Sequence, residues 1–103
     1  MKQALTLIVA SCVLLIAATG QAFAADATAG QAKSATCIAC HGVNGISPTE
    51  TYPNLAGQKQ SYMVKQMKAF KNGSRKDPTM NAMVTALSEQ DMQDIAAYYS
   101  QMK

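Results

Sequence analysis

The sequence is poor in the side chains that build metal clusters and reaction centres. Among its 103 residues there is one histidine, His41, and of the three cysteines only Cys37 and Cys40 lie close together. A structural zinc site usually takes four ligands, and no second cysteine pair exists to complete one. Strand-like alternation is also missing, which argues against the βαβ setting of a thioredoxin-type dithiol. The cysteine pair therefore needs another explanation.

That explanation is the pentapeptide Cys37-Ile38-Ala39-Cys40-His41. Two thiols three residues apart, followed at once by an imidazole, form the attachment pattern of c-type haem. The two sulfurs lie about one helical turn apart, so both can form thioethers with one porphyrin. The adjacent histidine can then bind the iron through a ring nitrogen. We predict one covalent haem c, bound by Cys37 and Cys40, with His41 as an axial iron ligand.

The N-terminus has the features of an export signal. An apolar stretch at residues 4–18 precedes Ala22-Phe23-Ala24, which matches an A-x-A cleavage site. We predict a secretory signal peptide at residues 1–24 and a mature domain at residues 25–103, located in the periplasm. The alternatives are a lipoprotein signal ending at Cys12 and an uncleaved membrane anchor. No stable membrane insertion of the mature form is expected.

Helical spacing dominates the mature part, which is short for building a core from side chains alone. Asp26 or Thr28 is the predicted cap of a first helix that runs towards Cys37. Gly30 inside it indicates either a close approach by another helix or simple tolerance. Residues 42–57 hold three glycines and two prolines, so we predict a loop there that wraps one face of the haem.

Two further helices follow from apolar stripes at helical spacing. The first covers residues 58–72, with Met63, Met67 and Phe70 on its stripe and Gly73 as its stop. Residues 74–87, which contain Pro78, are expected to begin irregularly. A last helix starts at Ser88, which forms a capping box with Asp91. Its predicted core residues are Met92, Ile95, Ala96 and Tyr99.

The second axial ligand cannot be histidine from the same molecule, because His41 is the only one. Methionine is the main remaining candidate. Helical periodicity assigns Met63, Met67 and Met92 to the core, and Met102 lies at the chain end. Met80 and Met83, both in the segment after Pro78, remain, and the residues alone do not separate them.

The motifs taken together resemble class I cytochromes c, in particular the small bacterial group of the c-553 type and the single domains of the c4 type. The resemblance covers the Cys-x-x-Cys-His motif, the Pro53-Asn54-Leu55-Ala56-Gly57 segment, a methionine in a loop, and the capped last helix with its tyrosine pair. It implies an all-α fold of about four short helices, with long loops around one haem.

Family resemblance also implies residue roles. The ligand methionine of this family stands seven residues before the leucine of the Leu-Ser cap, which selects Met80 over Met83. The carbonyl of Pro53 would accept a hydrogen bond from His41, and Arg75 would lie near a haem propionate. Gly30 and the region of Tyr98 match the place where the first and last helices cross.

The predicted function is electron transfer with His/Met ligation of the iron, without catalysis. A gas-binding or catalytic haem protein would need an open sixth site and a distal acid or base. A haem subunit or docking module of a larger oxidoreductase would use the same chemistry with a permanent partner. The expected partners are a redox protein donor and acceptor, and we expect a monomer.

Charge suggests where a partner could dock. Six basic residues lie between Lys59 and Lys76, opposed in that stretch only by Asp77, whereas the last helix is acidic. A basic surface of this kind would steer an acidic partner. The alternative is an ordinary solvated helix face. The modest net charge of an exported haem protein does not suit nucleic acid.

Overall fold

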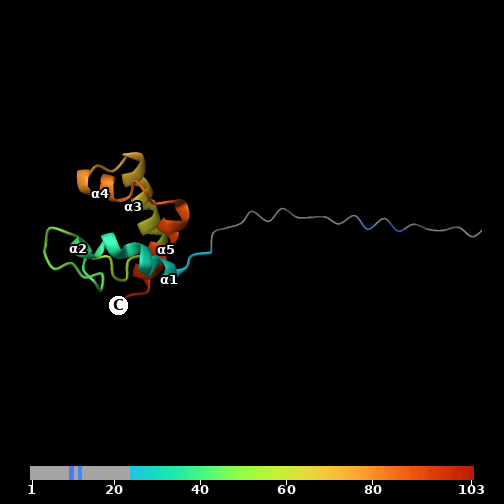
Figure 1. The fold of residues 1–103 in the computed structure, drawn as a ribbon, viewed down its shortest axis with the longest axis horizontal. Coiled ribbons are helices and arrows are strands. Elements are labelled where there is room, and N and C mark those ends of the chain that lie inside the picture. Colours follow the sequence, from blue (N-terminus) through green and yellow to red (C-terminus); the bar gives the residue numbers. More distant parts are fainter. Residues whose placement is uncertain (1–9, 11, 13–23) are drawn as a thin grey trace, which may run out of the picture.

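The computed structural model of the chain describes residues 10, 12 and 24–103, so the predicted signal peptide lies largely outside the described residues. The described part has no strand, which agrees with the all-α prediction, and no helix in it is long and apolar enough to cross a membrane. Its elements in order are α1 (Ala27–Lys33), the 3-10 helix η1 (Ser34–Thr36), α2 (Ile38–His41), α3 (Gln60–Asn72), α4 (Pro78–Met83) and α5 (Glu89–Ser100) (Figure 1).

The first and last helices, α1 and α5, cross at close range. Asp26 caps α1 by accepting hydrogen bonds from the backbone N–H groups of Thr28 and Ala29. Gly30 is buried at the crossing, where an added Cβ atom would lie 1.9 Å from the backbone oxygen of Asp94. The glycine is therefore required for the close approach of the two helices, and simple tolerance is not its explanation.

A buried carboxylate fastens the same crossing. Asp94 is 2% exposed. It accepts hydrogen bonds from the backbone N–H of Asp26 at 2.8 Å, from Lys33 Nζ at 2.7 Å and from Gln90 Nε2 at 2.8 Å. Lys33 Nζ also lies 2.9 Å from a carboxylate oxygen of Asp91. Asp91 and Asp94 of α5 thus bind α1, a role that charge patterning alone did not indicate.

The core lies where α3 packs on α5. The predicted apolar stripes on both helices are confirmed, and the capping box of Ser88 and Asp91 is present. Gly73 ends α3 in the left-handed conformation, with φ +81°. The buried side chains of the two helices are Met63, Val64, Met67 and Phe70 from α3, with Met92, Ile95, Ala96 and Tyr99 from α5.

The start of the segment after α3 is irregular, but α4 within it was not predicted. Pro78 does not interrupt this helix; it occupies the first turn, where its missing N–H costs nothing. Asp77 caps the helix by accepting a hydrogen bond from the backbone N–H of Met80 at 2.9 Å. Met80 and Met83 therefore stand on a short helix rather than in a loop.

The predicted loop between α2 and α3 is present and is fastened at a few points. The carbonyl oxygen of Gly45 accepts hydrogen bonds from the backbone N–H groups of Leu55 at 2.8 Å and Ala56 at 3.0 Å. The N–H of Gly57 donates to the carbonyl of Tyr99 at 2.9 Å, which ties the loop's end to α5. In Figure 1, α2 and this loop lie below α4 on one side of the molecule, with α1, α3 and α5 joining them.

Candidate functional site

The cysteine pair and the histidine stand on one short turn of helix. Cys37 ends η1 and precedes α2, and its carbonyl accepts the backbone N–H of His41 at 2.9 Å. Cys37 and Cys40 are free and partly buried. Three-residue spacing on a helix places both sulfurs on the same side. Burial raises the pKa of the Cys37 thiol, so the thiol form is favoured there.

His41 is held in a single orientation. It is 7% exposed, and its Nδ1 lies 2.8 Å from the carbonyl oxygen of Pro53. Because a carbonyl oxygen only accepts, this contact requires the proton on Nδ1. The hydrogen bond that the family resemblance implies is thus present, and Nε2 is left as the nitrogen with a lone pair for a metal.

The two candidate methionines differ in burial. Met80 is partly buried and packs against the hydrophobic core, whereas Met83 is 47% exposed. Asp77 fixes the backbone of Met80 at the first turn of α4. Of the two, only Met80 is held among other side chains. Its role as an iron ligand stays a prediction.

These residues fit a c-type haem. Two free thiols and an imidazole with one available nitrogen share the turn at α2. Met80 and Met83 stand on α4, and Figure 1 shows α4 above α2. In the described ranges, no three His, Cys, Asp or Glu side chains are grouped so that they could hold a bare metal ion.

Two buried polar side chains lie behind Cys37 that sequence analysis did not assign to the site. Ser34 and Tyr99 are both fully buried. The Tyr99 hydroxyl lies near Ser34 and Cys37, and burial raises its pKa to about 12. Ser34 could have been found from its position, since it stands three residues before Cys37 and shares its helical face.

Arg75 has protein partners of its own. Its guanidinium carbon lies 4.4 Å from the centre of the Phe70 ring, and its Nη1 donates to Gln66 Oε1 at 2.8 Å. Cation–π contacts of this kind hold an arginine against the surface. These contacts account for its position without a haem, and the propionate role stays a prediction.

The basic stretch is opposed by more than Asp77. Lys68 Nζ lies 2.6 Å from Glu89 Oε1, an ion pair between α3 and α5 that sequence spacing did not reveal. Lys71 donates to the carbonyl of Leu87. Lys59, Lys65 and Lys76 are also exposed. The cationic surface therefore exists, but part of its charge is engaged within the protein.

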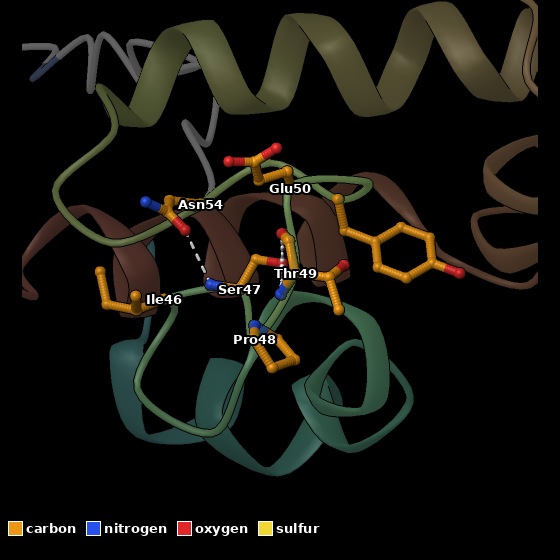
Figure 2. A pocket seen from close by; sticks show the side chains of 7 residues that line it. Ile46, Ser47, Pro48, Thr49, Glu50 and Asn54 are labelled. Atoms are coloured by element: carbon orange, nitrogen blue, oxygen red, sulfur yellow. Dashed lines mark hydrogen bonds between the residues drawn. The ribbon is translucent and has the colours of Figure 1, made fainter.

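The loop carries a hollow of its own, shown in Figure 2. The backbone N–H of Ser47 donates to Asn54 Oδ1 at 2.7 Å, and the Ser47 hydroxyl lies 2.7 Å from the carbonyl of Thr49. The lining consists of Ile46, Ser47, Pro48, Thr49, Glu50, Tyr52 and Asn54. None of Cys37, Cys40, His41, Pro53, Arg75, Met80 and Met83 is among them.

Comparison with known proteins points to the same family that the sequence motifs resemble. The family model described as "Cytochrome c" matches residues 17–103. Cytochrome c4 of Pseudomonas aeruginosa is 50% identical over 94 residues, which cover 90% of this chain and 47% of that protein. Cytochrome c-554(548) of Halomonas halodenitrificans is 46% identical over 80 residues, which cover 75% of this chain and 96% of that protein.

Solved structures agree with the fold. The crystal structure of reduced recombinant cytochrome c4 from Pseudomonas stutzeri superposes with a TM-score of 0.74 at 48% identity, over 78% of this chain and 47% of that one. The class I cytochrome c fold implied by the motifs is thereby confirmed. The chain spans about half the length of the cytochromes c4 it matches.

Proposed function

Because this chain belongs to the cytochrome c family, we propose that it is a single-electron carrier with one haem c and His/Met axial ligation. Membership of the family implies a covalently bound c-type haem, and one attachment motif is present in the sequence. The bound haem supplies a one-electron iron couple. The protein's tasks are to attach it, to ligate it and to exclude competing reactions.

Cys37 and Cys40 are the proposed attachment residues. Each thiol would add its S–H across one vinyl group, forming an S–C bond and giving the hydrogen to the other vinyl carbon, with no oxidant required. The three-residue spacing of the two free cysteines on one helical turn, directly before His41, supports this proposal.

His41 and Met80 are the proposed axial ligands. The hydrogen bond from His41 Nδ1 to Pro53 is the observation that carries this proposal, because it leaves Nε2 as the coordinating atom and fixes the ring. Partial burial against the core favours Met80 over the exposed Met83. A thioether ligand favours ferrous iron and so raises the reduction potential.

A filled sixth position leaves no site for a substrate, which distinguishes a carrier from a gas-binding or catalytic haem protein. Such a protein would need a distal acid or base, and the sequence offers no second histidine. Permanent association with a larger oxidoreductase would involve the same ligands and differs only in the partner.

Absorption and magnetic circular dichroism spectra of the matured protein test the ligands. We expect a low-spin spectrum with a methionine–iron charge-transfer band that Met80→Ala loses and Met83→Ala keeps. Loss of the band in Met83→Ala alone would reassign the ligand. A high-spin wild type that binds carbon monoxide readily would replace the carrier with a gas-binding or catalytic protein.

We further propose that the mature protein works in the periplasm, after cleavage following Ala24. The apolar stretch and the A-x-A site support this. The mass of the exported holoprotein tests it, since the predicted chain begins at Ala25. A chain that still carries residues 1–24, or that begins at a lipid-modified Cys12, would contradict cleavage at this site.

The proposed partners are redox proteins with an acidic docking face, which would meet the basic surface formed by Lys59, Lys65, Lys68, Lys71, Arg75 and Lys76. Exposure of all six residues supports the proposal, and the engagement of Lys68 and Lys71 limits its strength. Electron-transfer rates should then fall steeply as salt is added. Rates that do not change with salt would remove this surface from the docking model.

A further inference from the structure

The hydroxyl of Tyr99 is the one buried side-chain polar atom in the described part of the chain that has no hydrogen-bond partner. The residue is completely buried within the core. Leaving a buried hydroxyl unpaired costs free energy, so such groups are rare and call for an explanation. An apolar phenylalanine would fill the same space without this cost.

The neighbours of the hydroxyl limit what it can bind. Ser34 and Cys37 are the polar side chains beside it. The Ser34 hydroxyl already donates its hydrogen to the carbonyl of Gln31 at 2.8 Å, so it can act towards Tyr99 only as an acceptor.

Cys37 is the neighbour that changes. On the proposed function, on which this inference rests, its sulfur loses its hydrogen and gains a carbon when the haem is attached. A thioether sulfur has no hydrogen to donate and can only accept. A hydroxyl that still has its hydrogen available is then the complementary group, and Tyr99 provides it.

We propose that the Tyr99 hydroxyl donates a hydrogen bond to the thioether sulfur of Cys37 in the haem-loaded protein. Tyr99 is in this sense a positioning residue that acts on the haem through Cys37. The positive end of the O–H dipole would then point towards the sulfur that carries the haem. It therefore favours the reduced haem, which carries one positive charge less than the oxidised form.

The test compares the holoprotein with Tyr99→Phe, which removes only the oxygen atom. We expect the ratio of reduced to oxidised haem at a fixed potential to fall about two- to threefold, which corresponds to a midpoint lower by about 18 to 28 mV at 59 mV per tenfold. The C–S stretching band of the Cys37 thioether in the resonance Raman spectrum should shift as well.

Two variants act as controls. Tyr98→Phe removes a hydroxyl from the adjacent, less buried ring, whose centre lies 5.1 Å from that of Tyr99, and should leave both readouts unchanged. Ser34→Ala should also leave them unchanged. If Tyr99→Phe changes neither the midpoint nor the C–S band, the inference is wrong. If Ser34→Ala produces the same shift, the Tyr99 hydroxyl bonds to Ser34 rather than to the Cys37 sulfur, and the inference is also wrong.

The test of Tyr99 can fail while the proposed electron-transfer function stands. The wild-type spectrum reports whether the haem is low-spin and methionine-ligated. A wild type with that spectrum, together with a silent Tyr99→Phe, overturns the role of Tyr99 alone. A wild type without covalent haem overturns both.

Discussion

The helix crossing, formed by α1 and α5, and the haem side, formed by α2, residues 42–59 and α4, are built in opposite ways. At the crossing, the backbone of Asp94 lies against Gly30, and the Asp94 carboxylate accepts hydrogen bonds from three groups. On the haem side, α4 contributes no fully buried residue, and the loop is held by a few backbone hydrogen bonds.

Exposed apolar side chains show the same contrast. Within the described part, five of the six large hydrophobic residues that remain exposed belong to the haem side, and Tyr62 on α3 is the exception. The five are Ile38, Val43, Ile46, Tyr52 and Met83. Such a distribution would suit an apolar macrocycle packed between α2 and α4, since buried apolar area is the main stabilising contribution in folding.

We infer that the chain alone specifies the helix crossing, whereas the haem side needs the chain together with its cofactor. Domains of this size rarely build a sufficient core from side chains alone. Binding to the native state alone stabilises that state. The two halves should therefore respond differently to substitution.

Removal of both attachment residues should disorder the haem side more than the helix crossing. In Cys37→Ser/Cys40→Ser we expect complete loss of covalent haem, measured by the mass of the purified protein, and a poorly folded chain. Residual amide protection, measured by hydrogen exchange, should lie in α1 and the part of α5 around Asp94, because the contacts of Gly30 and Asp94 do not include the proposed haem-binding residues. Cys12→Ser is the matched control and should keep its haem, since Cys12 lies in the predicted signal peptide. Protection that persists in α4 and the loop would contradict the division of the fold.

A side chain at Gly30 should have the largest effect of any single change at the helix crossing. In Gly30→Ala the new Cβ meets a backbone oxygen that cannot rotate away. We expect the free energy of unfolding of the holoprotein to fall by about 3 kcal/mol, measured by denaturant titration. Gly73→Ala is the control, because no atom lies within 4 Å of its Cβ and only the positive φ is strained, at a cost of about 1 kcal/mol. Equal losses in the two variants would mean that the close approach is not the reason for Gly30.

Sequence reasoning recovered the parts of this fold that local pattern determines. The apolar stripes of α3 and α5 and the Ser88 cap each depend on residues within a few positions of one another, as does the cap at Asp26, which was one of two candidates with Thr28. The attachment motif is local too, and it alone indicated the cofactor. The ordered set of motifs added the fold through family resemblance.

What could not be predicted depends on distant or compensating contacts. The binding of Asp94 to Asp26 and Lys33 spans more than sixty residues, and charge counting does not reveal it. The helix α4 was not predicted, although proline suits a first helical turn when Asp77 precedes it as a cap. The unpaired hydroxyl of Tyr99 became visible only once burial and partners were known.

Loss of the buried carboxylate should weaken the crossing less than Gly30→Ala does. Asp94→Ala leaves the backbone N–H of Asp26 without its acceptor, for which we expect a loss of about 1 to 2 kcal/mol in the free energy of unfolding. The reduction potential should be unchanged, because the hydrogen-bond partners of Asp94 are not among the proposed haem-binding residues. A shifted potential would show that the two halves are coupled.

Acid should weaken the ion pairs of Asp91 and Asp94 with Lys33. The Lys33 ammonium holds the pKa of Asp94 below its ordinary value, and the backbone N–H of Ser88, followed by Lys33, lowers the pKa of Asp91 to about 2. A lowered pKa in the folded state means stability that is fully present above the unfolded value near 4 and is lost as the pH falls towards 2. Unfolding measured between pH 5 and pH 2 should therefore depend less on pH in Asp91→Asn than in the wild type. Identical slopes would exclude Asp91 as a source of the acid sensitivity.

The smallest effect on stability is expected at the ion pair between Lys68 and Glu89, which joins α3 to α5 on the surface. Both side chains are largely solvated, with exposures of 47% and 41%, and ion pairs of this kind contribute little to folding because water and salt screen them. Lys68→Ala should therefore unfold at the same denaturant concentration as the wild type. If the basic surface docks an acidic partner, the same variant should transfer electrons more slowly at low salt and equally fast at high salt, since the lost charge steers encounter rather than holds the fold. A variant that is destabilised but transfers electrons at the wild-type rate would assign Lys68 to the fold and remove it from the docking surface.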